Sequence, residues 1–483
     1  MEHMLIGDIF RNAGRAAPQR TAAALGADSL TFAQLDARSD RIAATAHTHG
    51  VRPGERVAVA LDKHLDAVVV FAALAKLGAV FTPLSAALPA AETARLIRAL
   101  APATLITTAS PSPDLRHLAR THGIPLLTAA ALEGADAPTA LPTAAVRETD
   151  PHTVFFTSGT TGRPKGIVLS HRVNYLRSHP GAQLEPRGAA VCPFPLTHMA
   201  AWTISLQQWQ ARDRVVYTPR ADGAVIRQAV RAHRATRLYC IPAVWERILQ
   251  EDHEALSTLR FADTGTSAVT PRLLAAIRRA APGACLRVFY GSTEAGNIAS
   301  IDGADLLTHP HSVGTPGTGI RLRRSSAGEI QIRGPVLFDG YLDNPAATAG
   351  AFDDGWYCTG DLCELDNDGR ITITGRTGDL IRTAGEAVSP TEVEQHLAGH
   401  PYVRDLAVVG LPHPTWGEVV CCAVVPHDPA SPPTLADLRR HLDGRLPAYK
   451  HPRIIAIVDA LPRTPATGQL QRSVLAVTLQ TPP

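Results

Sequence analysis

A run of hydroxyl side chains, glycines and one lysine follows a short apolar segment in Val154-Phe-Phe-Thr-Ser-Gly-Thr-Thr-Gly-Arg-Pro-Lys-Gly166. Glycines let the backbone approach phosphate oxygens closely, and their N–H groups can point inward as donors. The candidate nucleotide ligands in this run are Thr157, Ser158, Gly159, Thr160, Thr161 and Lys165. The run differs from the Walker pattern, because Pro164 stands where that pattern has its second glycine. A flexible polar surface turn is the alternative, but such a turn needs no concentration of donors.

Four further segments carry residue types that suit a nucleotide. They are Gly265-Thr-Ser267, Phe289-Tyr-Gly-Ser-Thr-Glu294, Tyr357-Cys-Thr-Gly-Asp361 and Gly375-Arg-Thr-Gly-Asp-Leu-Ile-Arg382. Each segment is weak evidence by itself. Together, and in this order, the five segments resemble the motifs of the adenylate-forming superfamily, which includes acyl- and aryl-CoA ligases, peptide-synthetase adenylation domains and luciferases. The resemblance extends over the whole chain.

The resemblance implies roles for residues in these segments. The implied nucleotide-binding residues beyond the first run are Gly265, Thr266, Ser267, Tyr290, Gly291, Thr293, Asp361 and Arg376. Thr293 would contact the phosphate, and Asp361 and Arg376 would contact the ribose. Glu294 would bind Mg²⁺, which together with Lys165 would offset the repulsion between ATP and a carboxylate. The alternative is that Glu294 and Asp361 are solvated acidic residues on the surface that bind no ligand.

Superfamily members pass the activated acyl group to a thiol after a small C-terminal domain rotates about a hinge. Gly378 stands at the hinge position, which is usually Asp or Lys in the superfamily. Gly385, in Ala384-Gly-Glu386, would leave the pantetheine tunnel open because it has no side chain. The residues that would contact CoA are Glu386, Trp416, Tyr449, Lys450, His451 and Arg453. A solvated basic turn is the alternative for the cluster at 449–453.

The segment Cys192-Pro-Phe-Pro-Leu-Thr-His-Met-Ala-Ala-Trp202 resembles the superfamily segment beside the substrate carboxylate. His198 would gate or line that site, although a lone histidine is more often structural. The segment lacks the aspartate that amino-acid-activating domains place against an α-ammonium group, so an amino acid substrate is disfavoured. The small side chains of Ala200 and Ala201 hint at a bulky, apolar acid.

One residue departs from the superfamily pattern, in Leu461-Pro-Arg-Thr-Pro-Ala-Thr-Gly-Gln-Leu-Gln-Arg472. Gln469 occupies the position of the lysine that bridges the carboxylate and the α-phosphate during adenylation. Glutamine donates a hydrogen bond without a charge, and loss of such a preorganised donor typically lowers a rate by about 10²–10³. The chain has only four lysines, Lys63, Lys76, Lys165 and Lys450, and its other basic residues are arginines. A general replacement of lysine by arginine would not place a neutral glutamine at position 469.

Three interpretations follow from Gln469. The favoured one is a non-adenylating acyl-CoA ligase that catalyses mainly thioesterification, acyl-AMP + CoA to acyl-CoA + AMP. The second is a complete ATP-dependent acyl- or aryl-CoA ligase, and the third is a non-catalytic acyl-adenylate-binding protein. The expected ligands are CoA and the AMP moiety of an acyl-adenylate, with Mg²⁺ and ATP only if adenylation is retained. A separate adenylating enzyme is the expected supplier of the adenylate.

The patterns along the chain predict the elements that position these residues. Strand-like runs such as 56–61 alternate with helical stretches such as 91–100, which predicts doubly wound parallel sheets. Alternation with period two, as at 329–333, indicates half-buried antiparallel strands. With the resemblance, we expect an α/β fold. Its large N-terminal adenylate-binding domain (1–377) combines doubly wound sheets with a distorted β-barrel subdomain, and a small mobile α+β domain (378–483) follows.

The composition excludes several classes of function. The net charge of +3, from 47 basic and 44 acidic residues, argues against nucleic-acid binding through a basic face. The 7 cysteines form no CxxC pair, which favours reduced thiols in a cytoplasmic protein without a metal–cysteine site. No signal peptide is visible at the N-terminus. The apolar stretch 67–88 is broken by Lys76, Gly78 and Pro83, so it predicts a buried helix and a strand, not a membrane span.

Overall fold

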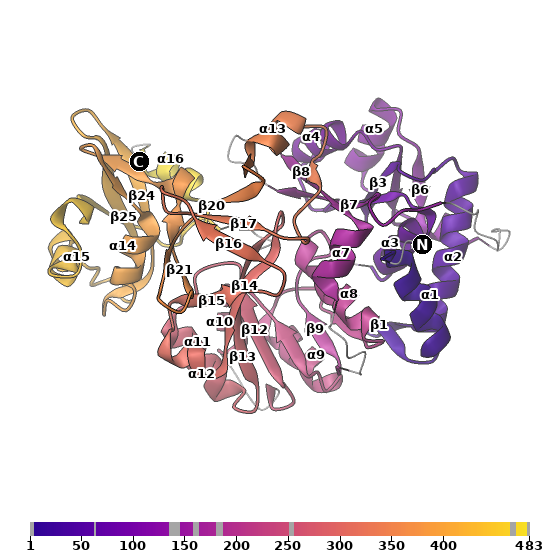
Figure 1. The fold of residues 1–483 in the computed structure, drawn as a ribbon, viewed down its shortest axis with the longest axis horizontal. Helices are drawn as coiled ribbons and strands as arrows, with labels where there is room; N and C mark the ends of the chain where they lie inside the picture. The colour runs from indigo at the N-terminus through magenta and orange to yellow at the C-terminus, as the bar shows by residue number, and fades with distance from the viewer. Residues whose placement is uncertain are drawn as a thin grey trace. The chain divides into compact units, whose positions relative to one another are not determined.

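The computed structural model describes residues 4–61, 64–134, 145–157, 164–179, 187–250, 256–463 and 470–480 (Figure 1). These residues form two compact units. The first comprises Met1–Ala304, Gly317–Ile320 and Arg333–Phe352, and the second comprises Asp305–Pro316, Arg321–Ile332 and Asp353–Pro483.

The first unit contains a sheet of mixed direction with the strand order β18-β8-β7-β4-β3-β5-β6. Its strands are β3 (Arg56–Ala60), β4 (Val80–Pro83), β5 (Thr104–Thr107), β6 (Leu126–Thr128), β7 (Pro151–Thr157), β8 (Lys165–Ser170) and β18 (Gly340–Tyr341). The pairs among β3, β4, β5 and β6 are parallel, and β4 also pairs in parallel with β7. The β7–β8 and β8–β18 pairs are antiparallel.

Another sheet of the first unit has the strand order β14-β13-β12-β11-β9-β10-β1-β2. Its strands are β1 (Thr21–Leu25), β2 (Asp28–Thr31), β9 (Ala190–Cys192), β10 (Val215–Tyr217), β11 (Arg237–Tyr239), β12 (Phe261–Gly265), β13 (Cys285–Ser292) and β14 (Gly296–Asp302). The strands from β1 through β13 in this order pair in parallel, so their carboxyl ends meet at one edge. Ligands bind at such an edge in doubly wound folds.

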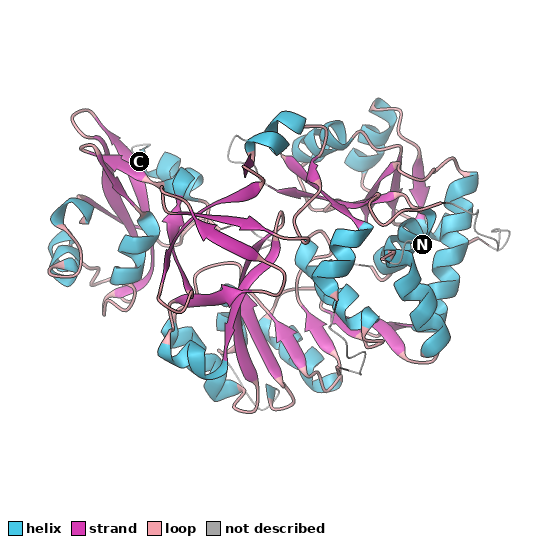
Figure 2. Ribbon diagram, viewed as in Figure 1, coloured by secondary structure: helices cyan, strands magenta, loops and turns pink. Residues whose placement is uncertain are grey.

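Helices cover the sheets of the first unit (Figure 2). They are α1 (Ile6–Ala16), α2 (Phe32–Thr48), α3 (Asp66–Leu77), α4 (Ala90–Leu100), α5 (Pro113–Thr121), α6 (Ala129–Leu132), α7 (His171–Ser178), α8 (Met199–Gln210), α9 (Gly223–Ala232), α10 (Pro242–Ile248), α11 (Pro271–Ala280), α12 (Gly303–Thr308, at the boundary of the units) and α13 (Pro345–Gly350). Helix α7 contacts β7 and β8, whereas α8 contacts β9 and β10, so α7 and α8 pack between the two sheets.

Helix α3 is apolar on every side, which is the pattern of a fully buried helix. Its Phe71 ring stacks on Trp202 of α8 at 4.2 Å and contacts Phe81 of β4 edge to face at 5.1 Å. Its two charged residues are both paired with α2: Lys76 contacts two carboxylates of that helix, and Asp66, at the start of α3, pairs with Arg38. The stretch predicted as a buried helix followed by a strand is therefore α3 and β4, as expected.

A buried histidine pair joins the start of β7 to the start of α7. The rings of His152 and His171 lie 4.6 Å apart, and both side chains are fully buried. The Nδ1 atom of His171 accepts a hydrogen bond from the Ile6 backbone N–H at 3.2 Å, and Nδ1 of His152 lies 3.1 Å from the Asn174 amide nitrogen. Neither Nε2 atom has a hydrogen-bond partner in the described part of the chain. Burial lowers the pKa of His171 to about 4 and also holds the pKa of His152 well below its ordinary value.

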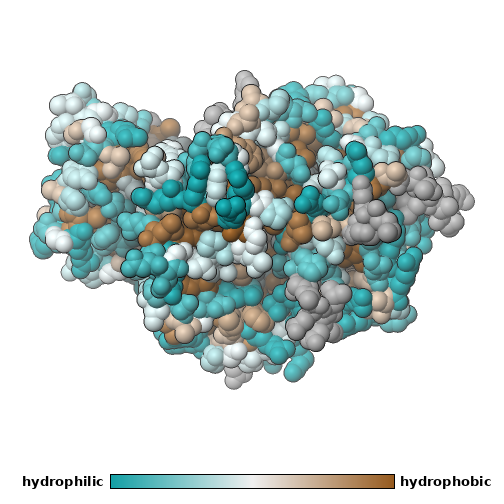
Figure 3. Space-filling model, in the orientation of Figure 1, coloured by the Kyte–Doolittle hydropathy of each residue, from teal (hydrophilic) through white to brown (hydrophobic). Residues whose placement is uncertain are grey.

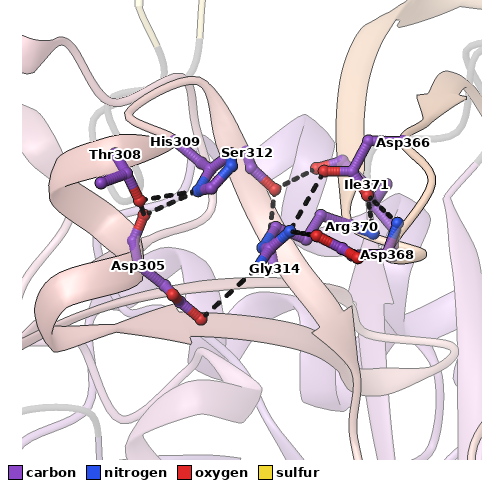
Figure 4. A network of polar contacts seen from close by, with 9 residues as sticks. All are labelled: Asp305, Thr308, His309, Ser312, Gly314, Asp366, Asp368, Arg370 and Ile371. Atoms are coloured by element: carbon purple, nitrogen blue, oxygen red, sulfur yellow. Dashed lines mark hydrogen bonds and ion pairs between the residues drawn. The ribbon is translucent and has the colours of Figure 1, made fainter.

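The second unit begins with an antiparallel sheet of order β16-β17-β20-β21-β15. Its strands are β15 (Ser312–Pro316), β16 (Arg321–Arg324), β17 (Glu329–Arg333), β20 (Trp356–Leu365) and β21 (Ile371–Arg376), with β19 (Phe352–Asp353) pairing with β20. The turn between β20 and β21 is fixed by Arg370, which lies 2.5 Å from Asp368, 3.4 Å from Asp366 and 3.9 Å from Asp305 (Figure 4). The turn signal Asp366-Asn-Asp-Gly369 thus coincides with an observed turn.

A smaller α+β part completes the second unit. Its elements are η2 (Thr377–Asp379), β22 (Ile381–Thr383), β23 (Glu386–Val388), α14 (Pro390–Leu397), β24 (Val403–His413), β25 (Gly417–Pro426), α15 (Leu435–Leu442), η3 (Ala448–Lys450), β26 (Ile454–Ile457) and α16 (Arg472–Gln480). Strands β24 and β25 bury alternate residues on their two faces, one against α14 and α15 and the other against α16. The sheet therefore has a hydrophobic core on each side.

The architecture confirms the predicted α/β fold, with a large N-terminal part built on sheets and a small C-terminal domain. The boundary expected at 377/378 stays a prediction. On the face drawn in Figure 3, hydrophilic side chains cover most of the periphery of both units. None of the helices in the described ranges is both long and apolar enough to cross a membrane.

Candidate functional site

The hydroxyl-rich run connects two paired strands of the first unit. Thr157 is the last residue of β7, Lys165 is the first residue of β8, and the two are direct partners in the antiparallel register. Both side chains are half-buried. Ser158, Gly159, Thr160 and Thr161 lie outside the described residues.

The lysine of this run is linked to the predicted metal ligand through a tyrosine. The Lys165 ammonium lies 4.9 Å from the centre of the Tyr341 ring, a cation–π distance. The Tyr341 hydroxyl donates to Oε1 of Glu294 at 3.3 Å. Tyr341 belongs to β18, which pairs with β8, so the lysine and tyrosine are brought together by strand pairing. Tyr341 was not predictable from the motifs, because it lies outside all five of them.

Arg177 of α7 holds the backbone of the predicted phosphate and metal segment. Its Nη1 donates to the Thr293 carbonyl at 2.8 Å and its Nη2 donates to the Glu294 carbonyl at 2.7 Å. Its Nε donates to the Val336 carbonyl at 2.8 Å. The rigid guanidinium fork therefore fixes two consecutive carbonyls of the YGSTE segment. Arg177 was also missed, since its role depends on contacts about 116 residues away in sequence.

Two of the predicted glycines are required by close backbone contacts. A Cβ added to Gly265 would lie 2.2 Å from the Phe289 carbonyl oxygen, and one added to Gly291 would lie 2.0 Å from the Gly296 carbonyl oxygen. Gly265 ends β12 and pairs with Phe289 of β13, so the Gly265-Thr-Ser267 and Tyr290–Glu294 segments leave the same edge of the sheet. Thr266 has a left-handed φ of 68°. The structure thus brings these two predicted segments together.

His198 caps the start of α8 at this edge. Its Nδ1 accepts a hydrogen bond from the Ala200 backbone N–H at 3.1 Å, which leaves the proton of the neutral ring on Nε2. Burial lowers the pKa of His198 to about 4, so the ring is neutral near pH 7. Its ring stacks on Phe194 at 5.7 Å. A neutral Nε2–H is a hydrogen-bond donor suited to a carbonyl or carboxylate oxygen.

Asp361 and Arg376, the predicted ribose residues, are partners in the second unit. They face each other across β20 and β21, and Arg376 Nε donates to Asp361 Oδ1 at 2.7 Å. The Asp361 side chain is 8% exposed and that of Arg376 is 63% exposed. A carboxylate has several lone pairs and can accept hydrogen bonds from hydroxyl groups in addition to an arginine.

Gly378 lies in the single turn η2, where its backbone does not adopt a left-handed φ and a Cβ would meet nothing within 4 Å. The neighbouring Asp379 accepts an ion pair from Arg472 Nε at 3.4 Å. The local geometry at 378 therefore permits a side chain, and a glycine there is not demanded by packing.

Gly385 forms the tip of the β22–β23 hairpin together with Ala384. Their φ angles are 86° and 52°, the pattern of a two-residue type I′ turn. The Ala384 N–H donates to the Trp416 carbonyl at 3.0 Å, which ties the tip to the loop before β25. Gly385 and Glu386 are exposed.

The predicted CoA contacts fall into two groups. Arg453 lies 3.6 Å from the centre of the Trp416 ring, and His413 stacks on the same ring at 4.8 Å. Tyr449, which precedes Arg453 in the same segment, is exposed to solvent. An adenine that stacks on Trp416 must share the ring with these partners or displace one of them.

Two other members of that set, Lys450 and His451, face other groups, whereas Glu386 is exposed beside the hairpin tip. The Lys450 ammonium pairs with both carboxylate oxygens of Glu392 at 2.6 and 2.8 Å. His451 is buried, and its Nε2 lies 2.9 Å from the Leu446 carbonyl oxygen. A CoA phosphate would have to compete with Glu392 for Lys450, so Arg453 is the most accessible cation of the cluster.

Gln469 lies outside the described residues, but both flanks of its segment are described. Arg463 and Leu470 form an antiparallel bridge. Arg463 pairs with Asp405 at 2.9 Å. Arg472 donates two bonds to the Glu394 carboxylate, at 2.5 and 2.8 Å, and one to the Val408 carbonyl at 3.0 Å. Both flanking arginines are thus bound to carboxylates of the second unit.

The chemistry of the donors fits the predicted ligands. Mg²⁺ in nucleotide sites is commonly held by one or two carboxylates together with the substrate phosphates, and Glu294 can supply such a carboxylate. Among the described residues, no group of three or more His, Cys, Asp or Glu side chains forms a self-sufficient metal cage.

Comparison with known proteins assigns the family. Residues 10–342 match the model of the AMP-binding enzyme family, and residues 392–467 match the model of the AMP-binding enzyme C-terminal domain. The chain belongs to the AMP-binding enzyme family. This finding confirms the adenylate-forming acyl- and aryl-CoA ligase superfamily predicted from the motifs. Neither match includes Gln469.

Similar members of this family cover nearly the whole chain. A feruloyl-CoA synthase from Amycolatopsis sp is 33% identical over 475 residues, which is 93% of this chain and 94% of that protein. A 4-chlorobenzoate–CoA ligase from Arthrobacter sp is 31% identical over 482 residues, covering 92% of this chain and 89% of that protein. The crystal structure of ATP-bound MatB from Rhodopseudomonas palustris superposes with a TM-score of 0.90 at 28% identity, covering 99% of each chain.

Proposed function

We propose that this protein is an acyl-CoA ligase-like enzyme that catalyses mainly the second half-reaction, acyl-AMP + CoA to acyl-CoA + AMP. The family assignment and relatives named as CoA synthases or ligases support the acid–thiol ligase class. The finer restriction to thioesterification rests on one observation. A neutral glutamine stands where the family has its adenylating lysine, and both neighbouring arginines are bound to carboxylates.

The other lysines do not replace the missing one. Lys76 is fully buried and pairs with Asp36 and Asp40 at 2.5 and 2.7 Å. Lys450 pairs with Glu392, and Lys165 lies over the Tyr341 ring. Lys63 lies outside the described residues. Every described lysine thus has a partner of its own, which supports an adenylation site short of one cation.

Transfer from a preformed adenylate does not need that cation. The thiolate sulfur attacks the acyl carbon, the new S–C bond forms, and the C–O bond to the phosphate breaks. AMP leaves with the electron pair, and the thiol proton passes to solvent or to a base. In this proposal, the neutral Nε2–H of His198 donates to the acyl carbonyl oxygen, and Asp361 holds the ribose of AMP. An adenylating enzyme elsewhere would supply the substrate.

A complete ATP-dependent ligase is the second candidate, because the Lys165, Tyr341 and Glu294 cluster retains the groups that adenylation needs around phosphate and Mg²⁺. A protein that only binds the acyl-adenylate is the third. The exposed hairpin tip at Gly385 and the accessible Arg453 favour a thiol acceptor over mere binding.

A paired assay tests the proposal. The first reaction contains a carboxylic acid, Mg-ATP and CoA, and the second contains the matching synthetic acyl-AMP and CoA. We expect thioester in the second reaction, with pyrophosphate exchange near background in the first. Rapid exchange by the native protein would establish the complete ligase instead. Binding of acyl-AMP without thioester formation would establish the binding protein.

A further inference from the structure

Three neighbouring strands of the first unit carry a polar group of unusual composition on one face. In the parallel register, Tyr239 of β11 pairs with Asp263 of β12, and Asp263 pairs with Arg287 of β13. Paired residues of neighbouring strands point to the same face of a sheet. Tyr239, Asp263 and Arg287 therefore form one row across the sheet. Gly265 and Phe289 form the next row, nearer the carboxyl ends of the strands.

Aromatic contacts connect this face to the predicted acid-binding residue. The ring of His198 stacks on Phe194 at 5.7 Å, and Phe194 contacts Tyr239 edge to face at 5.4 Å. Tyr239 in turn lies 5.7 Å from Phe289, and the Arg287 guanidinium lies 5.1 Å from the centre of the Phe289 ring. A continuous line of rings thus runs from His198 to Arg287.

The face carries more positive charge around Asp263 than this one carboxylate neutralises, because Arg237, which pairs with Phe261, lies one row nearer the amino ends of the strands. Arg287 binds the Asp263 carboxylate with two bonds of 2.6 and 2.7 Å. Arg237 packs on the same Phe261 ring as Arg287, at 3.9 Å, and its Nε is buried without a hydrogen-bond partner in the described part of the chain. Burial and the positive charges of Arg187 and Arg287 lower the pKa of Arg237 to about 10.

The Tyr239 hydroxyl adds an unused polar group. Its ring is half-buried among Phe194 and Phe289, and no described residue hydrogen-bonds its hydroxyl. Buried polar groups are normally paired, and on this face the buried atom without a partner among the described residues is Arg237 Nε. One aspartate already satisfies Arg287, so a structural role does not account for Arg237 and the Tyr239 hydroxyl as well.

We propose that Tyr239, Arg237 and the Asp263–Arg287 pair recognise an oxygen substituent at the far end of an aromatic acyl group. This inference rests on the proposed function, since it assumes that an acyl-adenylate lies beside His198. The row of Tyr239 and Asp263 is two residues from Gly265, or about 7 Å at the rise of a β-strand, which is roughly the length of an aromatic ring with its substituent. Arg237, in register with Phe261, is two residues further along, or about 14 Å from Gly265, and its long side chain would reach a longer substituent such as a carboxylate. The hydroxyl of Tyr239 serves a neutral phenol, and Arg237 serves a carboxylate or phenolate.

Binding of three stable adenylate mimics tests this specificity without any turnover. The probes are the acylsulfamoyl adenosines of cinnamate, 4-hydroxycinnamate and 4-carboxycinnamate, in which the sulfamate stands for the phosphate. We expect calorimetry to show about tenfold or tighter binding of one oxygen-bearing probe relative to the cinnamoyl probe, as one satisfied hydrogen bond provides. Tighter binding of the 4-hydroxycinnamoyl probe assigns the recognition to the Tyr239 hydroxyl, and tighter binding of the 4-carboxycinnamoyl probe assigns it to Arg237. Equal binding of the three probes, or binding of none, would overturn the inference.

Two conservative variants localise the preference. Tyr239→Phe keeps the ring contacts and should bring the hydroxycinnamoyl and cinnamoyl probes to within about threefold of each other. Arg237→Gln should do the same for the carboxycinnamoyl probe. Tyr217→Phe is the matched control, because its hydroxyl lies in β10 and is already bound to Ser205 at 2.6 Å. A preference that survives both Tyr239→Phe and Arg237→Gln would also overturn the inference.

Transfer assays separate this inference from the proposed function. If the probes are discriminated but no acyl-AMP yields thioester with CoA, the specificity stands and the transfer activity fails. If thioester forms from all three acyl-AMP substrates and the probes bind equally, the transfer activity stands and the specificity fails.

Discussion

In the proposed function, Gln469 is the residue that limits adenylation while leaving acyl transfer to CoA intact. Restoring the cation by Gln469→Lys should raise pyrophosphate exchange by about 10²–10³, because charge is returned where the carboxylate and the α-phosphate meet. Gln471→Lys is the matched control, since it adds the same charge two positions away. Exchange that stays at background in a folded, ATP-binding Gln469→Lys protein would mean that other parts of the first step are lost.

The buried histidine pair makes stability depend on pH. The folded state holds His171 neutral with a pKa of about 4, whereas an unfolded histidine has a pKa of about 6.5. The unfolded state therefore binds more protons between these values, and stability falls as pH decreases from about 6.5 toward 4. The loss from this residue approaches about 1.4 kcal/mol per pH unit.

Thermal unfolding at several pH values measures this effect. His171→Gln should flatten the fall in Tm below pH 6.5, although the variant starts from a lower Tm at pH 7. The exposed His122 offers the control substitution His122→Gln, which should leave the pH profile unchanged. Identical profiles for the native protein and His171→Gln would show that this pair does not control acid stability.

At the scale of an element, α7 acts as a clamp on the YGSTE segment through Arg177. Replacing Arg177 by Met removes three donors to backbone carbonyls and should weaken AMP binding by about tenfold or more, since each such bond contributes about 1 kcal/mol. Arg177→Lys should recover part of that loss with one ammonium donor. Arg172→Met, on the exposed side of the same helix, is the control. Unchanged AMP affinity in Arg177→Met would exclude the clamp.

The β22–β23 hairpin offers a second test at this scale. Asparagine tolerates a left-handed backbone, so Gly385→Asn should preserve the turn while placing a side chain in the expected thiol passage. We expect thioester formation from acyl-AMP to fall by about tenfold or more with AMP binding unchanged. Gly444→Asn is matched, because Gly444 has a φ of 72° and no atoms within 4 Å of an added Cβ. Equal loss in both variants would place the passage elsewhere.

The elements with strong local patterns were predictable, and the long-range contacts were not. Helix α3 and strand β4 follow directly from an apolar run with a break at Gly78. The five motif segments could be recognised from their residue types and their order along the chain. Tyr341 and Arg177 could not be predicted from short motifs. Tyr341 is brought to Lys165 by the pairing of β18 with β8, and Arg177 reaches Thr293 and Glu294 from its position on α7. The pairing of Lys450 with Glu392 was missed for the same reason.

Considered as a whole molecule, the chain distributes its predicted ligands over two units. The phosphate and metal residues belong to the first, and the ribose, thiol-step and position-469 residues belong to the second. The order of motifs gave the family and the mixed α/β fold. The arrangement of guanidinium groups around Asp263 could not be predicted, because Arg237, Asp263 and Arg287 stand in different strands and share no sequence pattern.

Removal of divalent metal should distinguish the two half-reactions in the intact protein. Thioester formation from supplied acyl-AMP should be unaffected by EDTA, because no triphosphate charge has to be neutralised. Pyrophosphate exchange by Gln469→Lys should disappear under the same conditions and return with excess Mg²⁺. A native transfer rate that falls severalfold with EDTA would assign the metal a role in the second step as well.

The bridge between Arg463 and Leu470, and the two anchored arginines beside it, have a genetic consequence. The supports on both sides of position 469 remain in place without a lysine between them. Glutamine and lysine codons differ only at their first base, so one C-to-A substitution exchanges the two residues. Under the proposed function, a population of cells that gained from making its own adenylate would need one point mutation at this codon. Selection on a library of random single-base changes should therefore recover this codon repeatedly.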